Sequence, residues 1–290
     1  GIDNINTYYD VNLKKLRLKE LSNYKNFSFK KIDITDRISL SESFNNFQPS
    51  IVINLAAQAG VRYSIENPYA YMDSNLVGFL NIIQLCKEYS VKNFLYASSS
   101  SVYGANKITP FSENQRVDTP ISLYGATKKA NELISYSYSH LYGLNTIGLR
   151  FFTVYGPWGR PDMAMFIFTK NIFERKPIKV FNNGKMLRDF TYIDDIISGI
   201  RSAINKNYNY EIFNLGNNKS EPLMDMISII EDKLGIKAII EYMPLQPGDV
   251  VETSADIKYS KKKLNYQPLV SIKDGIPLFI DWYKNYYNIK

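Results

Sequence analysis

Apolar and polar positions alternate along the first half of the chain in a pattern typical of a parallel sheet wrapped by helices. Short β-branched or aromatic runs that end in small or polar residues predict strands at residues 27–32, 51–55, 93–97 and 146–149. Segments of helical period separate these runs and predict helices at residues 36–47, 69–89 and 122–142. Thr35 or Asp36 is a suitable N-cap for the first helix. We therefore expect an α/β fold with its binding sites at the carboxyl ends of the strands.

The regular pattern ends near residue 150. Glycines and prolines then mark long loops, and helical stretches remain at residues 192–205 and 223–234. No internal repeat or low-complexity linker separates the two parts. We expect a Rossmann-type, doubly wound parallel sheet in residues 1–150 and a smaller α+β region, mainly in residues 151–290, that shares its cleft.

The composition is that of a globular protein, because 45% of the 290 residues are hydrophobic and 22% are charged. The single cysteine, Cys86, lies in an apolar helical segment, so no internal disulfide can form, and no paired Cys/His spacing suggests zinc. We expect no metal site and a reducing, cytoplasmic location. No apolar run approaches the ~18 residues of a membrane span and no signal peptide is recognisable, so we expect no membrane partner.

The net charge of +7 does not indicate a nucleic-acid-binding protein, because the lysines are scattered among acidic residues and asparagines. Lys261, Lys262 and Lys263 form the only tight basic run, which is typical of a solvated helix or loop face. The positive bias also suits an anionic small-molecule substrate. We expect no nucleic-acid partner.

The chain begins with Gly1-Ile2-Asp3-Asn4, and Asp3 stands where a dinucleotide-binding unit places the carboxylate that holds the adenosine ribose. A Gly-rich turn normally precedes this acid by about 20 residues and binds the pyrophosphate. None of the 15 glycines belongs to such an array. We interpret the sequence as a fragment that lacks the first strand and helix of its sheet, which would leave neighbouring strands without hydrogen-bonding partners.

The strongest local signal for chemistry is Tyr124 followed four residues later by Lys128 in the third predicted helix. This spacing places the phenol and the ammonium group on one helix face. A nearby positive charge stabilises a phenolate and brings the pKa of tyrosine toward the range of a general base. In a chain with 23 tyrosines, such a pair can also be part of an exposed helix face.

Ser98, Ser99, Ser100 and Ser101 follow the strand predicted at residues 93–97 and place hydroxyl groups at its carboxyl end. Ser99 is the candidate partner of Tyr124 because a hydroxyl there can donate to a reacting oxygen or accept from it. Serines after a strand also serve as turn or N-cap residues.

Together with further motifs, these residues resemble the extended short-chain dehydrogenase/reductase family over nearly the whole chain. The motifs are Gly1-Ile2-Asp3-Asn4, Asp33-Ile34, Asn54-Leu55-Ala56-Ala57, Ser98-Ser99, Val102-Tyr103-Gly104, Tyr124 with Lys128, and Leu149-Arg150-Phe151-Phe152. The resemblance implies bound NAD and a catalytic set made of Ser99, Tyr124 and Lys128. It implies NAD contacts from Asp3 and Asn4 at the adenosine ribose, Asp33 and Ile34 at the adenine, Leu55, Ala56 and Ala57 beside the pyrophosphate, Asn75 beside the nicotinamide, and Tyr124 and Lys128 at the nicotinamide ribose.

Two serines discriminate among the reactions of this family. Sugar dehydratases carry Asp-Glu directly before Val-Tyr-Gly, and UDP-glucuronate decarboxylases carry a glutamate in the second of these places. Here the two places are occupied by Ser100 and Ser101. Because elimination of water needs an acid and a base, the serines favour simple epimerisation.

Residues 152–164 resemble the UDP-glucuronate 4-epimerase signature, whereas galactose epimerases usually have asparagine in the place of Thr153. The resemblance implies that Arg160 binds the hexuronate carboxylate through a bidentate, charge-assisted hydrogen bond, with Thr153 and Ser100 as further donors. A salt bridge within the loop is the alternative role for Arg160. Arg62 is a second cation that serves either the substrate or the structure.

Two later segments resemble the part of the family that binds uridine diphosphate. The resemblance places Phe181 beside the uracil, Arg188 at a phosphate and Asp249 at the ribose. Gln246 stands where many relatives have arginine, so one diphosphate contact is absent from the expected set.

The expected reaction is C4 epimerisation of a UDP-hexuronate, UDP-glucuronate to UDP-galacturonate, through a 4-keto intermediate. A UDP-glucose or UDP-N-acetylhexosamine 4-epimerase and a catalytically silent UDP-sugar-binding protein are the alternatives. The resemblance also implies a homodimer formed through the helices predicted at residues 69–89 and 122–142. Bacterial surface polysaccharide synthesis is the pathway that it suggests.

Overall fold

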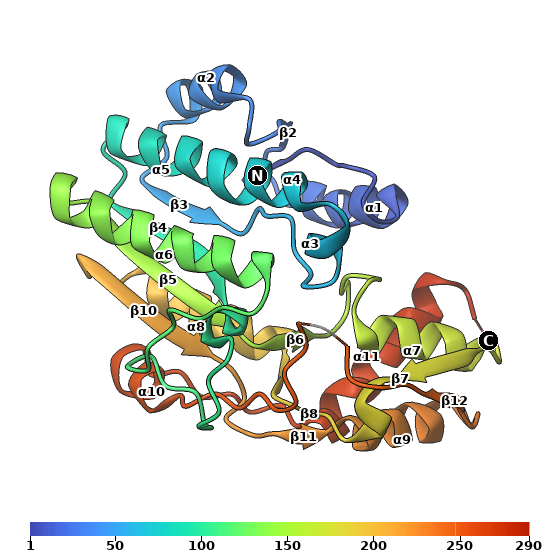
Figure 1. Ribbon diagram of the computed structural model, residues 1–290. Helices are drawn as coiled ribbons and strands as arrows, with labels where there is room; N and C mark the ends of the chain where they lie inside the picture. The colour runs from blue at the N-terminus through green and yellow to red at the C-terminus, as the bar shows by residue number, and fades with distance from the viewer. Residues whose placement is uncertain (247, 290) are drawn as a thin grey trace.

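A four-stranded parallel sheet lies at the centre of the computed structural model, which describes residues 1–246 and 248–289. The strand order is β10-β5-β4-β3 (Figure 1). The strands are β3 (Ile51–Asn54), β4 (Asn93–Ser99), β5 (Asn145–Phe151) and β10 (Tyr210–Leu215). The predicted α/β class is therefore confirmed. The sequence did not predict β10, which returns to the sheet from the second half of the chain.

Helices cover both faces of this sheet (Figure 1). Helices α5 (Phe79–Glu88) and α6 (Leu123–Tyr142) pack on one face, α8 (Ile193–Ile204) packs on the other, and α2 (Arg37–Phe47) packs on α5. The Asp36 carboxylate accepts hydrogen bonds from the amides of Ile38 and Ser39, both at 3.1 Å, and so caps α2 as expected. The Ser122 hydroxyl caps α6 by accepting from the Gly125 amide at 3.0 Å.

The single helix predicted at residues 69–89 is a chain of three pieces. Helix α4 (Pro68–Tyr71) continues into a π-helical segment, Met72–Gly78, and then into α5. A π-helical turn inserts an extra residue per hydrogen-bonded ring and redirects side chains, which the simple helical period does not reveal. Here the segment places Asn75 in the interior, where it is 1% exposed.

The N-terminal segment forms its own small unit. Strand β1 (Ile2–Asp3) pairs in parallel with β2 (Lys30–Lys31), so the strand predicted at residues 27–32 is confined to the residues that face β1. Helix α1 (Val11–Ser22) joins them and was not predicted, because its apolar residues form only a weak stripe. Within the part of the chain that the structure describes, β3 pairs on one side only, with β4.

The rest of the chain builds a second hydrophobic core at one end of the sheet (Figure 1). Its helices are α7 (Ala164–Phe173), α9 (Leu223–Leu234) and α11 (Ile272–Tyr286), and its strand pairs are β6 (Thr153–Tyr155) with β9 (Phe190–Tyr192), β7 (Pro177–Val180) with β12 (Ile239–Tyr242), and β8 (Leu187–Arg188) with β11 (Glu221–Pro222). The helices predicted at residues 192–205 and 223–234 are confirmed as α8 and α9. Over the described residues, no helix is both long enough and apolar enough to span a membrane.

Candidate active site

A cleft of about 1350 Å³ opens where the sheet meets the second core. Nearly all of the residues predicted to bind or act line it, namely Asp3, Asn4, Ile34, Leu55, Ala56, Ala57, Arg62, Ser99, Ser100, Tyr124, Lys128, Thr153, Arg160, Phe181, Arg188 and Asp249. These residues come from segments far apart in the sequence. The fold therefore gathers them around one space, as expected for the carboxyl ends of parallel strands.

Ser99, Tyr124 and Lys128 meet where the end of β4 faces the start of α6. Ser99 is the last residue of β4, and its hydroxyl accepts a hydrogen bond from the Ser101 amide at 3.1 Å. Lys128 lies one turn beyond Tyr124 on α6, is 3% exposed, and donates from Nζ to the Ala97 carbonyl at 2.8 Å. The helix is thus fastened to the strand at the residues that carry the hydroxyl and the ammonium group.

Burial shifts the pKa values of both α6 residues in the direction of their neutral forms. It raises the pKa of Tyr124, and the Ser99 hydroxyl and the positive charge of Arg160 oppose this rise. It lowers the pKa of Lys128 to about 8. The direction for Tyr124 is opposite to the one expected from Lys128, because desolvation outweighs the neighbouring charges in the structure.

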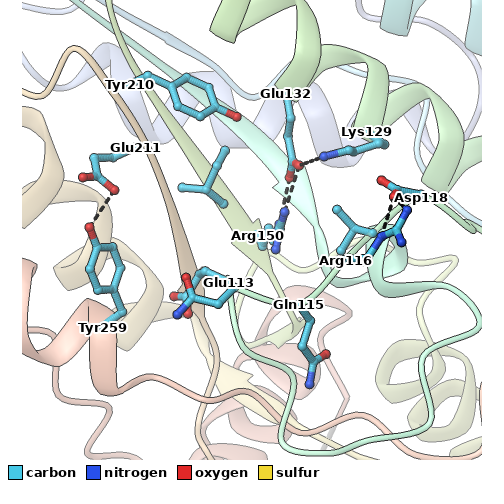
Figure 2. A pocket seen from close by; sticks show the side chains of 13 residues that line it. Glu113, Gln115, Arg116, Asp118, Lys129, Glu132, Arg150, Tyr210, Glu211 and Tyr259 are labelled. Carbon is cyan, nitrogen blue, oxygen red and sulfur yellow. Dashed lines mark hydrogen bonds and ion pairs between the residues drawn. The ribbon is translucent and has the colours of Figure 1, made fainter.

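A buried ion pair lies one further turn along the same face of α6 (Figure 2). Glu132 accepts from Arg150 Nε at 2.8 Å and from Arg150 Nη2 at 2.9 Å, and its Oε1 also accepts from the Ser98 hydroxyl at 2.7 Å. Arg150 Nη1 donates to the Tyr103 hydroxyl at 3.0 Å. The pair therefore joins α6 to β4 and β5 directly behind the cleft. It also forms part of the wall of a second cavity of about 520 Å³ (Figure 2).

Asn75 and Asp33 are not among the residues that line the cleft, and their predicted NAD contacts remain predictions. Asn75 accepts from the Gln58 amide at 2.8 Å and donates to the Thr127 hydroxyl at 3.0 Å, so it supports the loop after β3 from behind. Asp33 accepts from Asn4 Nδ2 at 2.7 Å and from the Thr35 amide at 2.9 Å. Both side chains order the residues that face the cleft.

On another wall of the cleft, Arg62 contacts two residues that were predicted to bind the nucleotide part of the substrate, Phe181 and Asp249. The Arg62 guanidinium lies over the Phe181 ring, 4.5 Å from its centroid, and donates to Asp249 Oδ2 at 3.2 Å. Arg188 lines the same cleft and donates from Nη1 to the carbonyls of Leu187 and Val251. Burial lowers its pKa, and the Asp249 carboxylate opposes this.

Asp162 and Tyr8 also belong to the cleft wall, and sequence reasoning gave them no role. Arg160 forms a bidentate ion pair with Asp162, and the Tyr8 hydroxyl donates to Asp162 Oδ2 at 3.2 Å. The salt bridge considered as an alternative role for Arg160 is therefore present, and Arg160 still lines the cleft. Asp162 could have been found from the sequence because it lies two positions after Arg160 in the same loop. Tyr8 could not, because it lies 154 positions away from Asp162.

Across residues 1–246 and 248–289, no three His, Cys, Asp or Glu side chains are placed to hold a metal ion.

Comparison with known proteins gives consistent matches. Residues 6–216 match the NAD dependent epimerase/dehydratase family. The chain is 50% identical to a UDP-glucuronate 4-epimerase of Thermodesulfobacterium geofontis, over 98% of this chain and 88% of that protein. It is also 50% identical to Protein CapI of Staphylococcus aureus, over 99% of this chain and 91% of that protein. It superimposes on the UDP-glucuronic acid 4-epimerase of Bacillus cereus, solved with UDP-glucuronic acid and NAD, with a TM-score of 0.93 and 34% identity over 99% of this chain and 91% of that one.

We predict that Arg150→Met destabilises the protein by about 3–5 kcal/mol, because it leaves the Glu132 carboxylate buried and unpaired. Urea unfolding monitored by circular dichroism measures this loss. Arg116→Met is the matched control, since Arg116 pairs with Asp118 at 2.8 Å but its side chain is 91% exposed, and an exposed pair contributes about 0–1 kcal/mol. Equal effects of the two substitutions would contradict the prediction.

Lys128→Met is expected to change how stability depends on pH. The pKa of Lys128 is lowered from 10.5 to about 8, so between these values the unfolded chain binds more protons and the wild type gains stability as pH rises. The substitution removes this gain, so the stability of the variant should exceed that of the wild type by about 3 kcal/mol at pH 7, and this difference should shrink toward pH 10. Urea unfolding at several pH values tests this, with the exposed Lys107→Met as control; a pH-independent difference would contradict it.

Proposed function

The chain belongs to the NAD dependent epimerase/dehydratase family, and we propose that it inverts C4 of UDP-glucuronate to give UDP-galacturonate, with NAD as its cofactor. The observation that carries the choice of sugar is the position of Arg160, whose guanidinium lines the same cleft as Tyr124 and Lys128. In a hexuronate the carboxylate is attached to C5, next to the reacting C4. A cation that shares the cleft with the proposed catalytic tyrosine is therefore suited to that carboxylate.

The cleft fits a dinucleotide at the ends of β1 and β3. Asp3 presents a carboxylate there, and Ile2 and Leu55 keep 36% and 53% of their surface exposed. Apolar side chains that line a cleft are covered when a ring or sugar face packs on them. We propose that Asp3, Asn4, Ile34, Leu55, Ala56, Ala57, Tyr124 and Lys128 hold NAD. When bound, NAD accepts the C4 hydride and returns it to the opposite face.

Tyr124 is proposed as the group that moves the proton of the C4 hydroxyl. Its phenolate accepts this proton as the carbonyl forms and gives it back after inversion. Lys128, held by the Ala97 carbonyl, supplies the positive charge that stabilises the phenolate. Ser99 at the end of β4 donates to the same sugar oxygen.

The remaining cleft residues are proposed to recognise the rest of the substrate. Arg160 binds the sugar carboxylate, and Thr153 and Ser100 donate to it. Phe181, Arg188 and Asp249 bind the uracil, a phosphate and the ribose, and Arg62 orders Phe181 and Asp249 through its contacts with both. On this proposal residues 1–150 bind mainly NAD and residues 151–290 mainly the UDP-sugar. We also propose a cytoplasmic location, since the single cysteine is free and buried.

We further propose that the protein is a homodimer. Large apolar side chains remain exposed on α6 and on the helical residues 68–88, including Leu133 at 58%, Tyr136 at 56% and Leu80 at 45%. Helices α5 and α6 pack against each other, so these side chains belong to one region of the surface. An exposed apolar face of this kind fits a second copy of the chain.

We expect Arg160→Ala to weaken the binding of UDP-glucuronate by about 10–100-fold, the range for loss of a charge-assisted hydrogen bond, and to leave UDP-glucose binding nearly unchanged. The measurement combines calorimetric titration with an assay for interconversion of UDP-glucuronate and UDP-galacturonate by the NAD-loaded wild type. Parallel loss on both sugars would assign Arg160 to the fold. A wild type that converts UDP-glucose but neither uronate would overturn the choice of substrate.

For the homodimer, light scattering coupled to gel filtration should give twice the chain mass. Leu133→Lys should shift this mass toward the monomer by placing a charge in the apolar contact, whereas Leu269→Lys, at an 82% exposed position outside α5 and α6, should not. A monomeric wild type would refute the proposal.

A further inference from the structure

A chain of polar contacts runs from the N-terminal segment to Arg160. Tyr8, which follows β1, donates from its hydroxyl to Asp162 Oδ2 at 3.2 Å. Asp162 in turn accepts from Arg160 Nε at 2.9 Å and from Arg160 Nη2 at 2.7 Å. The contacts link the half of the chain proposed to bind NAD to the loop that carries the sugar-binding cation.

The ion pair leaves one edge of the Arg160 guanidinium available. Asp162 occupies the edge formed by Nε and Nη2. Nη2 also donates to the Met163 sulfur at 3.7 Å, which is a weak acceptor, and Arg160 Nη1 has no acceptor among the described residues. A guanidinium has a second bidentate edge, formed by Nη1 and Nη2, that matches a carboxylate. Since Arg160 lines the cleft, this second edge is the part of it that can take an anionic group.

The loop that carries Arg160 is also held from α1. Arg17 donates from Nη2 to the Trp158 carbonyl at 2.6 Å and to the Gly159 carbonyl at 3.2 Å. Trp158 has a positive φ of 61°, an uncommon conformation for a side chain of this size. The N-terminal segment therefore fixes both the backbone of the loop, through Arg17, and the side-chain pair within it, through Tyr8.

Tyr8 is suited to a permanent donor role. Burial and the Asp162 carboxylate raise its pKa to about 12, so the hydroxyl keeps its proton at neutral pH. Its ring packs against Tyr63 with centroids 4.8 Å apart, which fixes the direction of the hydroxyl.

We infer that Tyr8 and Asp162 are positioning residues that set the selectivity of the cleft for a carboxylated sugar, by aiming the free edge of Arg160 at the sugar carboxylate. The inference rests on the proposed function, and it adds that selectivity depends on the orientation of Arg160 and not on an unpaired charge. Asp162 neutralises Arg160 in the resting cleft, so a neutral sugar meets no free cation there.

The test is calorimetric titration of the NAD-loaded protein with UDP-glucuronate, UDP-glucose and UDP. Tyr8→Phe keeps the ring and every charge but removes one hydrogen bond, so UDP-glucuronate should bind about 3–10-fold more weakly. Asp162→Asn, which breaks the bidentate pair, should weaken it by about tenfold or more. Binding of UDP-glucose and UDP should change less than twofold. Tyr24→Phe, at a 64% exposed tyrosine, is the matched control.

The same titrations show which results would overturn the inference. Equal weakening of all three ligands by Tyr8→Phe would give Tyr8 a merely structural role, and tighter binding of UDP-glucuronate to Asp162→Asn would show that Asp162 competes with the substrate. Failure of the proposed function is a separate result, namely a wild type that does not epimerise UDP-glucuronate. If the wild type epimerises UDP-glucuronate and the Tyr8→Phe variant has the same preference among the three ligands as the wild type, the inference is refuted and the proposed function is not.

Discussion

The buried ion pair between Glu132 and Arg150 is the interaction on which the site depends. Spacings of four place Tyr124, Lys128 and Glu132 on one face of α6, and Glu132 binds both Arg150 of β5 and Ser98 of β4. Any displacement of the helix along the sheet would leave a charge buried without its partner, which is strongly unfavourable. The register between the strand end and the helix is thereby fixed for the residues that face the cleft.

Ion pairs also hold two of the arginines that line the cleft. Arg160 is paired with Asp162 and Arg62 with Asp249, whereas Lys128 is buried against a backbone carbonyl with no carboxylate partner in the contacts described. A carboxylate partner lets an arginine stay partly buried before the ligand binds, and it fixes the direction of the remaining N–H groups. The same partner reduces the net attraction of the arginine for an anionic ligand. Lys128 and Arg188 are held by backbone carbonyls instead, and burial lowers the pKa of each, that of Lys128 to about 8. A Tyr124 phenolate would provide the missing negative charge beside Lys128.

The sequence was informative where a feature is local. Three predictions follow from residues a few positions apart, and the structure has these features. They are the N-cap of α2, the strands β3, β4 and β5, and the spacing of Tyr124 and Lys128 on one helix. Family resemblance placed Phe181 and Asp249 together at the nucleotide, and the contact of Arg62 with both was not predicted, because no spacing reveals a contact between such distant segments. The contact of Tyr8 with Asp162, the return of β10 and the π-helical segment around Asn75 depend on tertiary packing, which the periodicity of the sequence does not encode.

On the proposed function, the cleft must also prevent a side reaction. A 4-keto hexuronate is a β-keto acid, whose carboxylate leaves as carbon dioxide once its charge can pass onto the keto oxygen. Bidentate hydrogen bonds from Arg160 stabilise the charged carboxylate, and they favour the ground state over a transition state in which that charge has moved away. Ser100 and Ser101 add hydroxyl groups directly after β4. By the family resemblance, dehydratases carry acids in both of these places and decarboxylases carry a glutamate in the place of Ser101. The same orientation of Arg160 that selects the sugar would therefore also keep its carboxylate attached until C4 is reduced again.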